Sequence, residues 1–288
     1  MIVCKELGQE FETKEELFLA LKANKDRIIN IKKKTIYTGY DPINPENSKQ
    51  VVLNNQTKLK SLVKGTCKGM FDDENYYYFA VNTTKILDSH NDLHDDGIWN
   101  KTSKEQNGKN YLVDTHSLTI KDAIAYPEDV EIFVAEIPFK ALGKSYKGNT
   151  EALIYKVAKD AIRDDKVRKD LEDGKTMQAS VKMQYVKVQL AMNSDSEEDK
   201  EEFKTYLDNK DKIANKEDFE DEIYYFFLIK EAKNIHESSL VPFGSNPVTG
   251  RIKTDKNIEP SDKGTQHKEE QAASSTWDET FYKHLKSK

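Results

Sequence analysis

The chain has 288 residues, of which 33% are charged and 36% are hydrophobic, and its formal net charge is -6. These proportions predict a water-soluble protein with one core of moderate size and additional solvated segments. The acidic balance argues against a nucleic-acid-binding protein, which needs a basic face to contact phosphates. The sequence also has no apolar run of about 18 residues that could span a membrane.

The first residues and the cysteines indicate the cellular environment. The segment MIVCKELGQEFETKEEL is charged within five residues and lacks the apolar stretch of a secretory signal peptide. The two cysteines, Cys4 and Cys67, lie in no CxxC or Cys/His pattern. We therefore expect neither a zinc site nor a disulfide framework, and a reducing cytosol as the environment.

Residues 13–34 have the pattern of one amphipathic helix. Thr13 and Glu16 have the spacing of a capping box, in which each side chain binds the other residue's backbone N–H group. The predicted apolar face consists of Leu17, Leu21, Ile28 and Ile31. The turn-rich segment Tyr40–Asn55 predicts a linker, so residues 1–60 form an N-terminal helical extension with its linker.

The following segment has the pattern of β-structure. Two runs, Tyr76–Val81 and Thr84–Leu87, are strand-like, and a polar loop follows at Asp88–Trp99. His90 and His94 lie among four aspartates in this loop. Two interpretations remain open, a metal site made by a loop wrapped around an ion and a solvated acidic turn.

Four further elements are predicted in the middle of the chain. Strand patterns occur at Tyr111–His116, Asp129–Phe139 and Thr176–Met192. Apolar residues at helical spacing occur in Asn149–Asp173, which is followed by Gly174, a common helix stop. We predict one long helix over this segment.

A charged segment then separates two strands. Ser194–Glu222 contains thirteen acidic residues and five lysines. It predicts a charged helical insertion with Phe203 and Leu207 on one side and a hinge near Asn209. The β-branched and aromatic residues of Glu222–Glu231 predict the strand that follows.

The stretch Asn234–Gly250 continues this strand and ends it. Glu237 is followed by two serines and by Leu240 and Val241, and Pro242 then forces the chain out of the sheet. A carboxylate on a strand beside a forced turn is held rigidly against a partner. The stretch therefore predicts a functional carboxylate at Glu237.

The predicted flexible tail comprises residues 251–288. Residues 251–275 are polar and have no apolar period, which predicts disorder. Trp277, Phe281 and Leu285 are spaced by four, as on one face of a short helix. This end of the chain is interpreted either as a docking helix that folds on a partner or as a frayed terminus.

The Asn234–Gly250 stretch resembles a signature of a known family. It is similar to the "ExSLV…FPANP" motif of tailed-phage prohead (capsid maturation) proteases, which are serine peptidases with an assemblin-like fold. Gly244 stands where this family usually has Pro, and Ser245 where it usually has Ala. The matching residues are Glu237, Ser239, Leu240, Val241, Phe243, Asn246 and Pro247.

Two earlier segments also resemble this family. The family's nucleophilic serine opens a strand with the pattern "S-[IV]-G-[FY]", after a helix that ends in Gly. Ser180 and Val181 keep this pattern, whereas Lys182 replaces the Gly and Met183 the aromatic residue. An upstream "D-x-x-x-D…G-x-[FW]" loop of the family is matched by Asp88, Asp92, Gly97 and Trp99. The resemblance spans Gly65–Pro247.

The resemblance implies a catalytic triad. Ser180 would be the nucleophile, His116 the general base and then acid, and Glu237 the group that orients the imidazole. Herpesvirus assemblins use a second histidine as the third member, so the adjacent His236 is the alternative to Glu237. Neighbouring residues of a strand point to opposite faces, so only one of the two can reach His116.

The resemblance also implies a fold and a function. The expected fold is mixed α/β and β-rich, an assemblin-like β-barrel surrounded by helices in a protease domain over residues 61–250. The expected activity is that of a serine endopeptidase that cleaves capsid and scaffold segments during phage prohead maturation and sometimes cleaves itself. The alternatives are a catalytically inactive capsid-associated structural protein with the same fold, and a metal-binding module at His90 and His94.

The expected surroundings follow from the same resemblance. The substrates would be the major capsid protein and scaffold segments. No cofactor, no nucleic-acid partner and no membrane partner is implied. The protein would act as an oligomer or in many packaged copies inside the assembling prohead, in the host cytoplasm.

Overall fold

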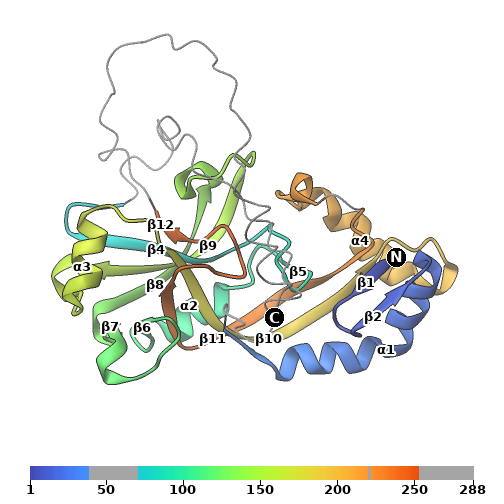
Figure 1. Ribbon diagram of the computed structural model, residues 1–288, viewed down its shortest axis with the longest axis horizontal. Coiled ribbons are helices and arrows are strands. Elements are labelled where there is room, and N and C mark those ends of the chain that lie inside the picture. The colour runs from blue at the N-terminus through green and yellow to red at the C-terminus, as the bar shows by residue number, and fades with distance from the viewer. Residues whose placement is uncertain (39–70, 220–221, 253–288) are drawn as a thin grey trace, which may run out of the picture. The chain divides into compact units, whose positions relative to one another are not determined.

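Two long antiparallel strands, β10 (Gln178–Met192) and β11 (Tyr225–Val241), carry the largest sheet of the protein. The computed structural model describes residues 1–38, 71–219 and 222–252. Figure 1 shows the two strands side by side, in yellow and orange. Their pairing shifts register between Val181 and Met183 and again near Lys187, which bends the strands and curls the sheet.

The largest sheet has six strands. On β11, the edge opposite β10 pairs in parallel with two short strands, first β5 and then β6. The order across the sheet is β3 (Ile36–Tyr37), β10, β11, β6 (Tyr111–Asp114) and β7 (Ala123–Ala125), with β5 (Asp92–His94) also on β11. Since β6 and β11 are parallel, their C-terminal ends lie at the same edge of the sheet.

A second sheet is antiparallel, and β10 packs against its strand β4. Its strands, in order, are β12 (Gly250–Arg251), β4 (Tyr76–Thr83), β9 (Asn149–Ala158) and β8 (Val130–Pro138). A small hairpin at the N-terminus pairs β1 (Ile2–Cys4) with β2 (Gln9–Phe11). The described part of the protein is therefore mixed α/β and rich in β-structure.

The helices lie at the periphery of these sheets. They are α1 (Lys14–Lys34), α2 (Asn100–Gln106), α3 (Asp165–Glu172) and α4 (Lys200–Asn209). Short 3₁₀ turns occur at Ile120–Asp122, Pro127–Asp129, Phe139–Leu142, Lys159–Ala161, Glu197–Asp199, Lys210–Lys212 and Lys216–Asp218. Both α1 and α4 pack on β10 (Figure 1). No helix in the described ranges has the length and apolar character needed to cross a membrane.

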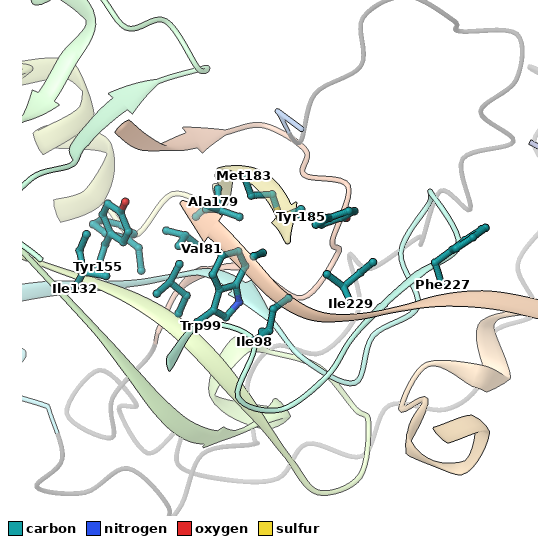
Figure 2. Packing of buried hydrophobic residues seen from close by; sticks show 14 of the residues in the cluster. Val81, Ile98, Trp99, Ile132, Tyr155, Ala179, Met183, Tyr185, Phe227 and Ile229 are labelled. Atoms are coloured by element: carbon teal, nitrogen blue, oxygen red, sulfur yellow. The ribbon is translucent and has the colours of Figure 1, made fainter. Parts of the chain in front are cut away.

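The main hydrophobic core lies between the two sheets. It joins apolar side chains of α1, β4, β8, β9, β10 and β11 in one cluster. Figure 2 shows Trp99 and Tyr155 in this cluster with Val81 and Ala179 around them, and both aromatic side chains are fully buried. Burial of such a side chain contributes roughly 1.5–3 kcal/mol or more, so this core dominates the stability of the fold.

The prediction of one helix over Asn149–Asp173 is wrong. The first part of this segment is strand β9, and only Asp165–Glu172 is α-helical. On β9, Leu153, Tyr155 and Val157 belong to the main core, whereas Ala152 and Ile154 belong to a second cluster on the other face. A strand buried on both faces has apolar residues without the two-residue alternation, and such a run cannot be distinguished from a helix by its spacing.

The predicted stop at Gly174 is confirmed. Gly174 has φ +68° and follows Asp173, the C-cap residue of α3. Its N–H group donates to the carbonyl of Leu171, and the N–H group of Lys175 donates to the carbonyl of Asp170. This left-handed turn ends the helix and leads the chain into β10.

The predicted N-terminal helix is confirmed at both ends, since α1 is capped by Thr13 and ends at Lys34. The cap differs from the predicted box, because the Glu16 carboxylate accepts from the N–H of Glu12 and not from that of Thr13. Ile31 is exposed and does not belong to the buried face. The buried face packs into the main core, so this helix shares one core with the sheets.

The segment between β4 and α2 is more ordered than predicted. Thr84–Leu87 is not a strand, and only Leu87 forms an isolated bridge, with Leu93. The predicted polar loop at Asp88–Trp99 contains strand β5, and its residues Asp92 and His94 are buried. A solvated acidic turn is therefore wrong for this segment.

The charged insertion contains α4, which ends at Asn209 as predicted. Its buried side is different from the predicted one, because Tyr206 is buried and Leu207 is exposed. The predicted strands Tyr76–Val81, Asp129–Phe139, Thr176–Met192 and Glu222–Glu231 are confirmed as β4, β8, β10 and the first part of β11. The predicted linker Tyr40–Asn55, the boundary at residue 60 and nearly all of the predicted tail 251–288 lie outside the described residues.

Candidate functional site

The candidate site lies where β6 and β11 end and β10 begins. Ser180 on β10 is the register partner of Ser239 on β11, and Ser239 is in turn the partner of Val113 on β6. Side chains at paired positions of neighbouring strands project to the same face of a sheet. Glu237 precedes Ser239 by two residues and shares that face.

His116 reaches this face through an unusual turn. Thr115 and His116 follow β6 and have φ values of +45° and +58°, in the left-handed region. Each such residue costs on the order of 1 kcal/mol unless it is glycine. Two hydrogen bonds to β11 hold the turn, from the N–H of Thr115 to the carbonyl of Leu240 (3.1 Å) and from the N–H of His116 to Ser239 Oγ (2.8 Å).

The His116 ring lies against the Glu237 carboxylate. Nδ1 is 3.0 Å from Oε1 and 3.2 Å from Oε2, and the Glu237 side chain is completely buried. A carboxylate can only accept, so Nδ1 carries the proton of this hydrogen bond. In a neutral ring Nε2 then has a free lone pair, which is the tautomer that a general base needs.

The other ring nitrogen has no partner within the described ranges. Nε2 of His116 is buried and makes no hydrogen bond there. Buried polar atoms without a partner are rare in native proteins and point to a functional role or to a group that binds there. The hydrogen bond from Nδ1 to Glu237 therefore orients the imidazole, and Nε2 is available to accept a proton.

Ser180 shares the sheet face with this pair but does not contact the ring through a hydrogen bond. Its neighbours Ala179 and Val181 belong to the main core, so Ser180 projects to the opposite face, as Ser239 does. The residue is 5% exposed, and its hydroxyl makes no hydrogen bond to any residue that the structure describes. A serine hydroxyl without such bonds can rotate to bind a substrate or a base. Catalytic hydrogen bonds are often formed only when the substrate is present.

The chain that leaves β11 passes directly over the start of β10. The N–H group of Gly244 donates to Gln178 Oε1, at 2.6 Å. A Cβ atom at Gly244 would lie 3.2 Å from the carbonyl oxygen of Ala179, so a larger residue there would crowd the strand. Ser180, Gly244 and Asn246 line a hollow of about 10 Å³, room for about one water molecule beside the serine.

The alternative third member, His236, does not face His116. It is exposed, has φ +64° and lies beside the buried Glu237 on the strand. The structure thus brings His116 and Glu237 together, places Ser180 on the same face, and directs His236 away. Sequence reasoning missed a role for Ser239, whose hydroxyl contacts both His116 and Glu237. Its position two residues from Glu237 on a predicted strand was the available signal.

Comparison of the chain with protein-family models, curated proteins and solved structures gives no match. The site is therefore interpreted from its own geometry. That geometry is a carboxylate–imidazole pair with an unpartnered Nε2 and a serine hydroxyl on the same sheet face, an arrangement suited to acyl transfer.

A second buried polar cluster lies behind α1. Lys32 Nζ is 2.6 Å from Asp92 Oδ1 and 3.5 Å from Glu6 Oε1, and the Tyr185 hydroxyl donates to Asp92 Oδ2 at 2.9 Å. Burial raises the pKa of Asp92 to about 7 even with Lys32 beside it. Burial lowers the pKa of Lys32, but the two carboxylates outweigh this effect and leave the pKa raised.

His94 belongs to this cluster. Its Nδ1 lies 2.9 Å from Asn82 Oδ1, and its Nε2 lies 3.3 Å from the Tyr185 hydroxyl. Burial lowers the pKa of His94 to about 4, so the ring is neutral near pH 7. In the part of the chain that the structure describes, no group of three or more His, Cys, Asp or Glu side chains could hold a metal ion. The indole N–H of Trp99 donates to the same Asn82 oxygen. The buried side chains of His94 and Trp99 thus hold the segment Asp88–Trp99 in an ordered conformation.

The Lys32→Met variant is expected to lose about 3–5 kcal/mol of unfolding free energy at pH 8. Met has a similar volume, but Asp92 and Glu6 would remain buried without their cation. Asp92 has a raised pKa in the folded state, so its ionisation opposes folding as the pH rises through that pKa. The loss should therefore shrink toward pH 5, where a carboxyl without a cation takes up a proton.

Urea unfolding of the unmodified protein and of Lys32→Met, at pH 8 and at pH 5, measures the loss of unfolding free energy. The matched control is Lys34→Met, because Lys34 is exposed on the same turn of α1 and should change stability by no more than about 0.5 kcal/mol. Equal losses in the two variants, or a Lys32→Met loss that does not depend on pH, would contradict a buried charge cluster.

Proposed function

We propose that this protein is a serine endopeptidase of the Ser-His-Glu type. The observation that carries the proposal is the His116 ring, whose Nδ1 binds the buried Glu237 while its buried Nε2 has no partner within the described residues. The register of Ser180 with Ser239, which places both on the sheet face of Glu237, supports Ser180 as the hydroxyl that this nitrogen would activate. This combination has a known chemical use, the activation of a weak nucleophile by an oriented imidazole.

In the proposed reaction, Ser180 Oγ attacks the carbonyl carbon of a peptide bond. Its proton passes to Nε2 of His116, and Glu237 stabilises the imidazolium that forms. The imidazolium then gives the proton to the leaving amine nitrogen, and water hydrolyses the acyl-enzyme with His116 as the base. Substrate binding brings Oγ and Nε2 to hydrogen-bonding distance, about 2.6–3.2 Å.

The proposed substrates are capsid and scaffold segments of an assembling prohead. This part of the proposal rests on the resemblance of three segments to prohead proteases, including the Glu237–Pro247 signature. An assemblin-like barrel is the proposed finer description of the curled, β-rich fold. We propose no cofactor, because Ser-His-Glu acyl transfer needs none.

The test is incubation of the purified chain with candidate capsid and scaffold proteins from the genome that encodes it, followed by intact-mass measurement. Shortened capsid or scaffold products are expected with the unmodified chain and absent with Ser180→Ala. A shortened form of the chain itself would indicate self-cleavage. Unchanged masses of all proteins with the unmodified chain would refute the peptidase proposal.

Two observations favour the alternative of a capsid-associated structural protein. Ser180 makes no hydrogen bond to the His116 ring, and Lys182 and Met183 replace the glycine and aromatic residue of the family's pattern. A protein of this kind would bind capsid or scaffold proteins without shortening them. Co-purification with the capsid protein at unchanged mass would identify it.

A further inference from the structure

Ser239 connects the two parts of the candidate site that come from different strands. Its hydroxyl accepts the backbone N–H of His116 at 2.8 Å and donates to Glu237 Oε2 at 3.0 Å. The residue is completely buried on β11. One hydroxyl therefore fixes the backbone that carries the imidazole and the carboxylate that orients the ring.

The Glu237 carboxylate depends on this hydroxyl for its position. Oε1 contacts His116 Nδ1 at 3.0 Å, while Oε2 lies 3.2 Å from the same nitrogen and accepts from Ser239. Hydrogen bonds to a charged acceptor are stronger than those between neutral groups. With its second oxygen fixed, the carboxylate presents the first to the ring in one orientation.

The backbone of His116 depends on Ser239 as well. The left-handed conformation at Thr115 and His116 is unfavourable for both residue types, and the structure retains it through bonds to β11. Without the acceptor at Ser239, the N–H of His116 would lose its partner in a part-buried position. The turn could then relax, and the ring would move from the carboxylate.

We propose that Ser239 is a positioning residue of the site. Its two hydrogen bonds hold the His116 ring and the Glu237 carboxylate in the relative orientation that proton transfer from Ser180 requires. This inference rests on the proposed endopeptidase function. Ser239 does not contact the substrate and is not the nucleophile, because its single proton is donated to Glu237 and its side chain is fully buried.

The kinetic test compares Ser239→Ala with Ser239→Thr. Alanine removes both hydrogen bonds, and kcat should fall on the order of 10- to 100-fold with KM within about 2-fold. Threonine keeps the hydroxyl and is well tolerated in a strand, so it should retain kcat within about 3-fold. The matched control is Ser238→Ala, since Ser238 is equally buried, is adjacent on β11 and contacts Asn234 instead of the pair.

A spectroscopic test does not require activity. The proton between His116 Nδ1 and the Glu237 carboxylate should give a far-downfield proton NMR signal, identified by its loss in Glu237→Gln. Ser239→Ala should abolish or shift this signal, whereas Ser239→Thr and Ser238→Ala should retain it. Thermal unfolding of each variant identifies any that fails to fold.

The two tests separate this inference from the proposed function. If the unmodified chain cleaves nothing, the peptidase proposal fails, but the NMR comparison still measures the role of Ser239. An unchanged signal in folded Ser239→Ala would overturn the inference. Wild-type kcat in Ser239→Ala, or an equal loss in Ser238→Ala, would overturn it as well.

Discussion

Ser180→Ala is expected to reduce turnover of a cleavable peptide on the order of 10⁶-fold, the loss seen when a serine peptidase loses its nucleophile. The change removes one oxygen atom from a strand position where alanine fits, and Ser180 makes no hydrogen bond to a described residue that the fold would lose. The free energy of unfolding should therefore change little. The measurement is single-turnover cleavage of a peptide that carries the mapped cleavage site.

Ser238→Ala is the control for this experiment. It removes a buried serine oxygen from the adjacent strand, on the face away from His116 and Glu237. It should keep turnover within about 10-fold of the unmodified chain, since buried serine substitutions away from a site act through stability. A Ser180→Ala protein that cleaves at the unmodified rate would show that another group is the nucleophile.

Glu237→Gln is expected to reduce kcat on the order of 10⁴-fold while KM changes little. Glutamine has the size of glutamate, but its NH₂ group can donate to Nδ1 of His116. That arrangement favours the tautomer with the proton on Nε2, which cannot accept a proton from Ser180. The imidazolium would also lose the negative charge that stabilises it.

The control for Glu237→Gln is His236→Ala. His236 is the neighbouring residue and the alternative third member, but it is exposed and directed away from the site. Its replacement should leave kcat within a few-fold of the unmodified value. If His236→Ala lost activity and Glu237→Gln did not, the assignment of the orienting group would have to be reversed.

The elements that the sequence predicted well have strong local signals. The helix after Thr13 has a capping residue and an apolar face, and the strands β8 and β10 have clear alternation or β-branched runs. Glu237 could be placed on a strand because the β-branched and aromatic run before it predicts one, and Pro242 marks where that strand ends. These signals depend on nearest neighbours and are therefore visible without the fold.

The strand β9 was missed because tertiary structure decides its state. Its residues between Ala152 and Val157 are buried on both faces by different clusters, so their pattern carries no period of two. The buried position of Lys32 was missed for a related reason. Lysine near the end of a helix is usually exposed, and only the distant Asp92 and Glu6 make its burial favourable.

The geometry of the candidate site was only partly predictable. The resemblance named Ser180, His116 and Glu237, but no local signal indicates two consecutive left-handed residues at Thr115 and His116. This turn is unfavourable in isolation and is held by bonds to β11, a strand more than 100 residues away. Long-range bonds of this kind decide where the imidazole points.

The most direct test of the account is a crystal structure of the chain after reaction with a peptidyl phosphonate, a reagent that bonds to activated serines. The account predicts a phosphorus–oxygen bond at Ser180, with His116 Nε2 within about 3.2 Å of that oxygen. Nδ1 of His116 should still donate its hydrogen bond to the Glu237 carboxylate. A chain that does not react at Ser180, or a His116 ring whose Nε2 lies beyond hydrogen-bonding reach of it, would contradict the account.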